Sequence, residues 1–273
     1  MIPTTLVRIT DNRILLGMGH QLWTTLEGEN PGGSIKDRMV KPELLELKSR
    51  GITYISEISA GSTALSLAFY TQEFGLKCQL FVPDNIDKNL KEKLIHCGAQ
   101  LVECDPKKAY EEYEVYCQSS NNWRFGQMQK KELRLHYKKW AENALGLNLP
   151  CLDLVIGSVG TGHSLLGVKL ALNPKFGCVV AEPKFDQPVS GIRNLTHQNF
   201  GQSDSCEQEL IEHRLEIDKT QFYAGHHIES DHGIISISDS FRLTLGAAVS
   251  FLNKTDKAAK VFLVGSHCRL SSK

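Results

Sequence analysis

Residues 26–38, with the sequence LEGENPGGSIKDR, form the stretch around which the chain of 273 residues is organised. A short strand pattern ends at Glu27, a turn rich in Gly, Asn and Pro follows, and a helix-like apolar periodicity begins near Lys36. Lys36 is therefore expected where the turn enters the helix. The positive end of the helix dipole disfavours a charged amine at that place and lowers its pKa. A lysine with a lowered pKa is suited to Schiff-base chemistry.

The same stretch resembles the cofactor-lysine segment of the cysteine synthase and cystathionine β-synthase family. The family pattern is close to E-G-x-N-P-x-G-S-x-K-D-R, and residues 27–38 match every fixed position. The family consists of fold-type II enzymes of pyridoxal 5′-phosphate (PLP). The resemblance implies that Lys36 binds PLP covalently and later serves as the general base at the substrate Cα. Residues 5–9 also resemble the family's opening T-P-L-V-R-L, so we expect residue 1 to be the true start of the chain.

Composition and charge narrow the range of partners. The chain has 31 Lys and Arg against 31 Asp and Glu, which gives no reason to expect binding to nucleic acid or to an anionic membrane. We find no signal-peptide pattern and no apolar run of the roughly 18 residues that a membrane helix needs. The 8 cysteines are scattered without a C-x-x-C pair. We therefore expect no common zinc site, and a cytoplasmic protein with reduced thiols.

Strand patterns alternate with helix patterns of about 10–15 residues, which predicts right-handed βαβ units and mostly parallel sheets. The expected α/β fold becomes more specific through the resemblance. It implies the fold-type II architecture of two α/β subdomains around a central cleft. The larger part, residues 1–33 and 144–273, would bind the cofactor phosphate, and the smaller part, residues 34–143, would carry the substrate loop. We also expect a short strand at 13–17, and a helix at 206–214 within the weakly patterned stretch of residues 184–232.

A glycine-rich turn at residues 157–164 separates a buried strand pattern from a helix pattern. Glycines allow backbone amides to converge on an anion, and a helix N-terminus adds a favourable dipole, so phosphate is the natural ligand. The turn resembles the family's G-T-G-G-T phosphate cup, with His163 in place of a glycine, so that a side chain must fit there. The expected phosphate-binding residues are Gly160, Thr161, Gly162, His163 and Ser164.

Residues 59–63, Ser-Ala-Gly-Ser-Thr, resemble the family's T-S-G-N-T loop. From the residues alone, a helix N-cap explains this stretch equally well. The resemblance implies that Ser62 replaces the asparagine that contacts the 3′-oxygen of PLP. It also implies a glutamine that touches the substrate carboxylate, for which Gln127 fits best and Gln129 is the alternative. The expected substrate-binding residues are Ser59, Ala60, Gly61, Thr63 and Gln127.

Thr244 lies two residues before the glycine of a segment that resembles S-x-G-A-A-V, where the family hydroxyl meets the pyridine nitrogen of PLP. Such a partner leaves the nitrogen largely unprotonated, which favours β-elimination and replacement over transamination. A threonine that caps its own helical turn is the alternative. Ser236, Ser238 and Ser240 are rival partners. The histidines at 226, 227 and 232 have no spaced carboxylates, so we expect a polar loop and no metal.

The resemblance implies β-replacement on an activated serine, O-acetylserine or O-phosphoserine, by a homodimeric enzyme whose partner is a small amino acid. A 2,3-diaminopropionate-type synthase and a desulfhydrase are the enzymatic alternatives. The remaining alternative is a catalytically degenerate homologue that acts through a partner. That alternative rests on Ser62, on His163 and on the short segment before Thr244.

Overall fold

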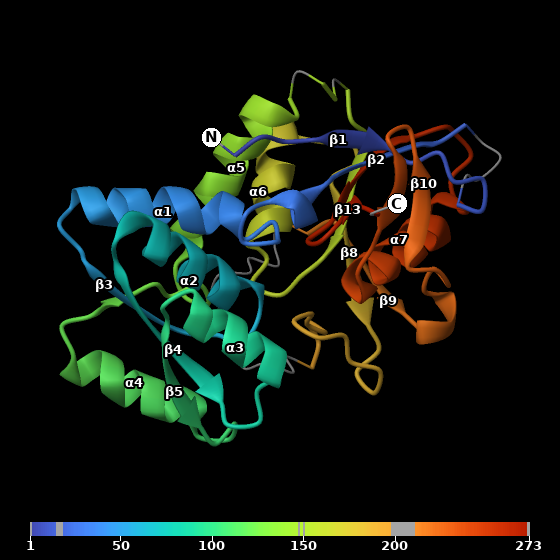
Figure 1. Cartoon of the computed structure of the whole chain (residues 1–273). Coiled ribbons are helices and arrows are strands. Elements are labelled where there is room, and N and C mark those ends of the chain that lie inside the picture. Colours follow the sequence, from blue (N-terminus) through green and yellow to red (C-terminus); the bar gives the residue numbers. More distant parts are fainter. Residues whose placement is uncertain (1, 15–18, 147, 150, 198–210, 272–273) are drawn as a thin grey trace. The chain divides into compact units, whose positions relative to one another are not determined.

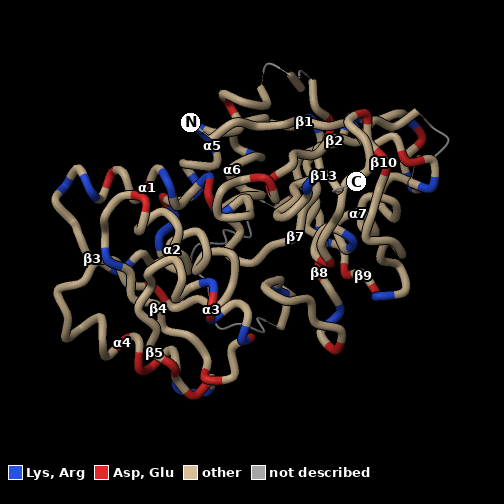
Figure 2. The backbone as a smooth tube through the Cα atoms, viewed as in Figure 1, with Lys and Arg blue, Asp and Glu red and all other residues tan. Residues whose placement is uncertain are grey.

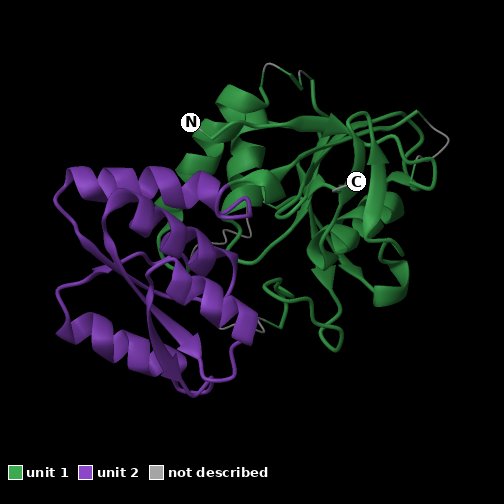
Figure 3. Ribbon diagram, in the orientation of Figure 1, with its two compact units in different colours: residues 1–30, 128–273 green, residues 31–127 purple. Residues whose placement is uncertain are grey.

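The structure is a computed structural model, and it describes residues 2–14, 19–146, 148–149, 151–197 and 211–271. The chain divides into two compact units (Figure 3). Unit 1 comprises residues 1–30 and 128–273, and unit 2 comprises residues 31–127. The predicted parts, 1–33 with 144–273 and 34–143, differ from these units at both boundaries.

Unit 2 is a four-stranded sheet, in which every neighbouring pair is parallel, together with four helices (Figure 1). The strand order is β5-β4-β3-β6. The strands are β3 (Tyr54–Ile58), β4 (Lys77–Pro83), β5 (Gln100–Cys104) and β6 (Trp123–Arg124). The helices are α1 (Asp37–Ser49), α2 (Ser62–Phe74), α3 (Lys88–His96) and α4 (Ala109–Ser119).

Local sequence signals explain where the unit 2 helices begin and end. The Asp87 side chain accepts a hydrogen bond from the N–H of Leu90 at 2.9 Å and caps the start of α3. Gly75 follows α2 with φ 67°, and Gly98 lies just beyond α3 with φ 77°. Glycine adopts this left-handed conformation without steric cost, so both helices end where the chain must turn back into the sheet.

Unit 1 contains a six-stranded sheet with the order β1-β2-β12-β7-β8-β9 and a three-stranded sheet with the order β10-β11-β13. The first sheet is parallel except for the β1–β2 pair, and the second is antiparallel. Its strands are β1 (Leu6–Arg8), β2 (Gln21–Thr25), β7 (Leu154–Ser158), β8 (Cys178–Pro183), β9 (His213–Ile217) and β12 (Lys260–Val264). The small sheet consists of β10 (His227–Ser230), β11 (Gly233–Ser236) and β13 (Arg269–Leu270).

The helices of unit 1 are α5 (Arg134–Ala144), α6 (His163–Leu172) and α7 (Asp239–Leu252), with short 3-10 turns at Glu27–Glu29, Lys131–Leu133 and Lys219–Gln221. Helix α7 contacts β7, β8, β9 and β12 of the large sheet and buries Leu243 and Leu245 there. Helices α5 and α6 pack closely, because a Cβ added to Gly167 would lie only 2.5 Å from the Cβ of Tyr137. This packing explains why residues 128–143 belong to unit 1.

Two predicted elements are wrong where the structure describes them. Residues 12–14 form a turn instead of a strand, because the Asp11 carboxylate accepts a hydrogen bond from the N–H of Arg13 at 2.9 Å and imposes an Asx-type turn. Residues 15–17 of that prediction lie outside the described residues. Residues 213 and 214 of the predicted helix belong to β9, which pairs with β8. Residues 206–210 lie outside the described residues.

The positions of charged residues along the chain agree with the balanced composition. Within each unit, Lys and Arg are interspersed with Asp and Glu along the backbone (Figure 2). Within the described ranges, no helix combines the length and the apolar character that crossing a bilayer requires.

Candidate active site

The turn that carries Lys36 is held by the residue that follows it. Asp37 is completely buried, and its Oδ2 accepts hydrogen bonds from the N–H of Gly32 at 2.6 Å and from the Tyr70 hydroxyl at 3.1 Å. Its Oδ1 accepts a hydrogen bond from the Ser66 hydroxyl at 2.7 Å. A side chain at position 32 would displace the Asp37 carboxylate, because an added Cβ would lie 2.3 Å from that same Oδ1. These contacts give Gly32 and Asp37 a structural role in the turn around Lys36.

Lys36 is the N-cap residue of α1, and its side chain remains partly accessible to solvent. Desolvation of the amine lowers the pKa of Lys36 to about 8. The direction agrees with the sequence prediction, and desolvation of the amine is its cause. At neutral pH this amine is therefore far closer to its neutral, nucleophilic form than a solvated lysine is.

Desolvation of the Lys36 amine makes the stability of the cofactor-free protein depend on pH. The pKa is about 8 when folded and 10.5 for the free side chain, so the folded state binds fewer protons between these values. The free energy of unfolding therefore rises as pH increases from about 8 to 10.5. The same increase disappears as pH falls back through that window. We expect Lys36→Met to remove this slope and to raise the free energy of unfolding near pH 7 by about 1–3 kcal/mol. Urea denaturation across this pH range tests the expectation, with the exposed Lys88→Met as control.

The predicted substrate loop follows the end of β3 and leads into α2. Gly61 is the N-cap residue of α2, and Ser62 is the first helical residue. The Ser59 N–H donates to the Phe81 carbonyl at 3.1 Å, which ties the start of the loop to β4. The structure therefore shows the helix start that the residues alone predict, and substrate binding by this loop stays a prediction.

Two of the predicted substrate-binding residues meet within unit 2. The Thr63 hydroxyl donates to Oε1 of Gln127 at 2.6 Å, and both side chains are buried. Gln127 follows β6, which pairs directly with β3. Because the Gln127 oxygen accepts from Thr63, the donor group of this side chain is its amide nitrogen. The alternative, Gln129, belongs to unit 1.

The glycine-rich turn of unit 1 connects β7 to α6. Gly162 is the N-cap residue of α6 and has φ 85°, so the left-handed conformation falls on a glycine. His163 then begins the helix with its side chain fully buried. The predicted demand for space at position 163 is therefore met without backbone strain. Gly160 lies so close to the neighbouring loop that an added Cβ would be 2.6 Å from the Gly191 carbonyl oxygen.

This turn fits the phosphate group of a cofactor. It offers backbone N–H groups at the N-terminus of a ten-residue helix, without side chains at Gly160 and Gly162. The hydroxyls of Thr161 and Ser164 lie on the same segment. The assignment of residues 160–164 to phosphate binding remains a prediction that this geometry supports.

Alanine at position 160 is expected to weaken PLP binding by about 10-fold to 100-fold. The new Cβ would push the turn away from the Gly191 carbonyl and move the amides that would bind the phosphate. Titration of the cofactor-free protein with PLP, followed by absorption, measures the effect. Gly98→Ala is the control, because it strains a left-handed glycine in unit 2 without touching the turn. An unchanged affinity in Gly160→Ala would contradict the phosphate assignment.

Thr244 is fully buried in α7, and its hydroxyl donates to the Ser240 carbonyl at 3.0 Å. The structure therefore shows the alternative named in the sequence analysis, a threonine whose hydroxyl bonds to a carbonyl of its own helix. The hydroxyls of Ser238 and Ser240 share a hydrogen bond of 2.9 Å at the start of the same helix. Because a hydroxyl has one proton to donate, Thr244 would have to redirect it to meet a ring nitrogen. Its role as the pyridine partner, and the rival roles of Ser236, Ser238 and Ser240, stay predictions.

Arg193 is a candidate that the sequence analysis missed. Its side chain is only 3% exposed, and its N–H donates to the Val159 carbonyl at 2.8 Å, beside the glycine-rich turn. Asn194 holds this loop in place by donating to the Pro183 carbonyl at 3.1 Å. The one available signal was an arginine after Gly191 in a weakly patterned stretch. The structure thus places a cation in the loop that borders the turn.

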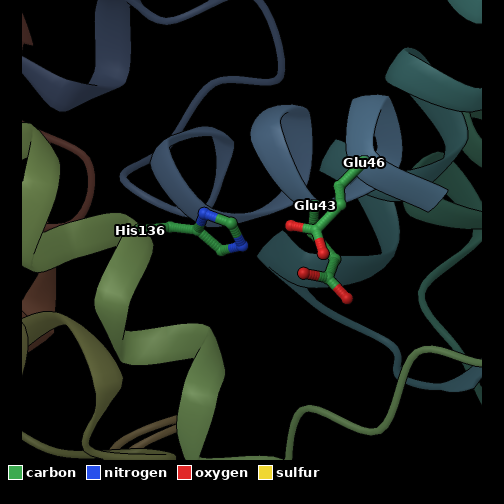
Figure 4. Close-up of side chains that lie close together, drawn as sticks. All are labelled: Glu43, Glu46 and His136. Atoms are coloured by element: carbon green, nitrogen blue, oxygen red, sulfur yellow. The ribbon is translucent and has the colours of Figure 1, made fainter. Parts of the chain in front are cut away.

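The two clusters of histidine and carboxylate side chains in the described part of the chain carry no metal assignment. His232 pairs with Asp231 at 2.9 Å, whereas His226 lies 3.3 Å from the Arg242 guanidinium, which disfavours a cation there. Figure 4 shows the Glu43 and Glu46 side chains on α1, with carboxylate oxygens within 4.8 Å of one another. His136, labelled in the same figure, belongs to α5 of unit 1.

Comparison with known proteins decides the family. The sequence model of the family described as "Pyridoxal-phosphate dependent enzyme" matches residues 1–239. This chain belongs to the pyridoxal-phosphate dependent enzyme family. The predicted resemblance, the predicted cofactor PLP and the assignment as a PLP-dependent enzyme are thereby confirmed.

Relatives and solved structures agree with this family. A cysteine synthase of a Flavobacterium species is 29% identical over 207 residues, covering 71% of this chain and 66% of that protein. A cysteine synthase of Aquifex aeolicus is 24% identical over 198 residues, covering 65% and 58%. The matched part of this chain thus spans less than two thirds of the length of these relatives.

A solved hydrogen sulfide-producing enzyme of Fusobacterium nucleatum superposes with a TM-score of 0.78 at 20% identity, covering 97% of this chain and 94% of that one. At this identity the likeness concerns the fold. Together with the family, it confirms the predicted fold class, a fold-type II α/β protein with mostly parallel sheets.

Proposed function

We propose that this chain carries out PLP-dependent β-replacement on an activated serine, O-acetylserine or O-phosphoserine, with sulfide as nucleophile. The observation that carries the proposal is Lys36, a lysine with its pKa lowered to about 8 in a turn that matches the family motif. The names of the two relatives, both cysteine synthases, support the same chemistry.

The residues of the family motifs carry the proposed roles. The Nζ of Lys36 would bind PLP and then move the proton at the substrate Cα. Bound PLP would supply the electron sink that makes this carbon acidic. Thr63 and Gln127, with the N–H groups of residues 59–62, would orient the substrate carboxylate. Residues 160–164 would hold the cofactor phosphate, and Thr244 would meet the ring nitrogen.

A spectral screen of the PLP-loaded protein tests the proposal. O-phosphoserine and O-acetylserine should each change the absorption of the bound cofactor, and sulfide should restore it with release of cysteine. An amine that restores the absorption in place of sulfide would indicate the 2,3-diaminopropionate-type reaction. Sulfide release from cysteine would indicate a desulfhydrase. A stable cofactor band that no activated serine alters would contradict the proposal and indicate a degenerate homologue.

The resemblance also implies a homodimer with a small amino acid as its substrate, and a location in the cytoplasm. We include the homodimer in the proposal, because enzymes of this family are commonly dimeric. Sedimentation equilibrium of the PLP-loaded protein tests it. The location stays a prediction.

A further inference from the structure

Glu57 is a buried carboxylate that the proposed chemistry does not use. It lies on β3, two residues before the substrate loop, and is 1% exposed. Burial raises the pKa of Glu57 to about 7, and the charge of Arg124 acts in the opposite direction. Arg124 is itself engaged with the Glu114 carboxylate at 2.8 Å. A carboxylate in such a place carries a desolvation cost that its hydrogen bonds must offset.

The hydrogen bonds of Glu57 join two segments of unit 2. Its Oε1 accepts from the N–H of Ile58 at 2.8 Å, and its Oε2 accepts from the N–H of Gln127 at 3.0 Å. The ladder between β3 and β6 ends just before this point, with the N–H of Phe125 donating to the Ser56 carbonyl at 2.9 Å. The Glu57 side chain therefore continues the attachment where backbone pairing stops.

This attachment leads directly to the predicted substrate loop. Gln127, whose N–H is held by Glu57, accepts the hydroxyl hydrogen bond of Thr63 at 2.6 Å through its own side chain. All three side chains are buried, with 1%, 3% and 8% exposure for Glu57, Thr63 and Gln127. A shift of the Gln127 backbone would move its amide away from Thr63. The position of the Gln127 side-chain amide thus depends on the hydrogen bond from the Gln127 N–H to the Glu57 carboxylate.

We infer that Glu57 is a positioning residue for the substrate carboxylate: it fixes the backbone of Gln127, whose side-chain amide, held at its oxygen by the Thr63 hydroxyl, then meets the carboxylate through its nitrogen. The inference rests on the proposed function, because it takes these two residues as the carboxylate subsite. Glu57 itself contacts neither substrate nor cofactor in this role.

Glutamine at position 57 separates this role from simple packing. The amide has nearly the shape of the carboxylate, and it removes the cost of burying a charge. It offers one acceptor oxygen where the carboxylate offers two, so either Ile58 or Gln127 loses its acceptor and faces an NH₂ donor instead. Glu57→Gln should therefore fold, but the backbone at Gln127 should be held less firmly than in the wild type. Glu57→Asp is a second variant, which keeps the charge and withdraws it by one methylene.

The test compares two ligands that differ by a carboxylate alone. L-alanine and ethylamine are titrated into the PLP-loaded protein, and binding is followed by the absorption of the bound cofactor. We expect Glu57→Gln to raise the Kd for L-alanine by about tenfold and to leave the Kd for ethylamine unchanged. Glu57→Asp should act in the same direction. Glu103→Gln is the matched control, because Glu103 lies on β5 of the same sheet, is 41% exposed and pairs with Lys91.

A second readout needs no ligand. Amide hydrogen exchange of the peptide that contains residues 125–127 should be faster in Glu57→Gln than in wild type and unchanged in Glu103→Gln. Equal weakening of both ligands, or an unchanged Kd for L-alanine, would overturn the inference while leaving the proposed function intact. A wild-type protein that binds PLP but neither ligand would overturn the proposed function and, with it, the inference.

Discussion

Replacement of Lys36 by alanine is expected to abolish the covalent attachment of PLP and to lower the rate of β-replacement by at least about 10³-fold. The variant removes both the nucleophilic amine and the group that moves the Cα proton. Treatment of the PLP-loaded protein with borohydride, followed by digestion and mass measurement, shows whether a cofactor-labelled peptide spans Lys36. Steady-state kinetics with O-phosphoserine and sulfide gives the rate.

Lys41→Ala is the matched control for this experiment. Lys41 lies on the same helix, one turn further along, with its amine 3.7 Å from a Glu73 carboxylate oxygen. It should keep both the labelled peptide and the activity. A labelled peptide that persists in Lys36→Ala, or that maps to another lysine, would refute the assignment of the cofactor lysine.

Replacement of Asp37 by alanine is expected to lower the free energy of unfolding by about 3–5 kcal/mol. The carboxylate accepts three hydrogen bonds in a fully buried place, from Gly32, Ser66 and Tyr70. Its loss leaves these donors without that acceptor and creates a cavity beside the lysine turn. Urea denaturation of the cofactor-free protein, followed by circular dichroism, measures the change.

Asp84→Ala is the control, because Asp84 is an exposed aspartate in the same unit. Its effect should stay within about 0.5 kcal/mol. A loss below about 1 kcal/mol in Asp37→Ala would show that the turn around Lys36 is held by other contacts. Where Asp37→Ala still folds, its PLP affinity should fall as well, because the Gly32 turn that leads to Lys36 is released.

Much of the fold was predictable because its signals are local. Alternation of apolar strand patterns with amphipathic helices follows from backbone geometry within each segment, and it predicted β3, α2, β4 and α3. The segments that failed have other determinants. The turn at 12–14 depends on the side chain of Asp11, and β9 exists through its pairing with β8. The strands of the small sheet have two to four residues, too few for a periodic signal.

The candidate site divides in the same way. The lysine turn and the glycine-rich turn were predictable from the order of residues alone. Each is a contiguous motif whose backbone conformation depends on its own glycines, and the resemblance to the family rests on these motifs. Tertiary structure decided what surrounds them. The Asp37 contacts with Tyr70, the Glu57 contact with Gln127 and the loop of Arg193 beside Val159 join residues between 33 and 70 positions apart. Burial, which sets the pKa of Lys36, likewise arises only when distant segments exclude water from one amine.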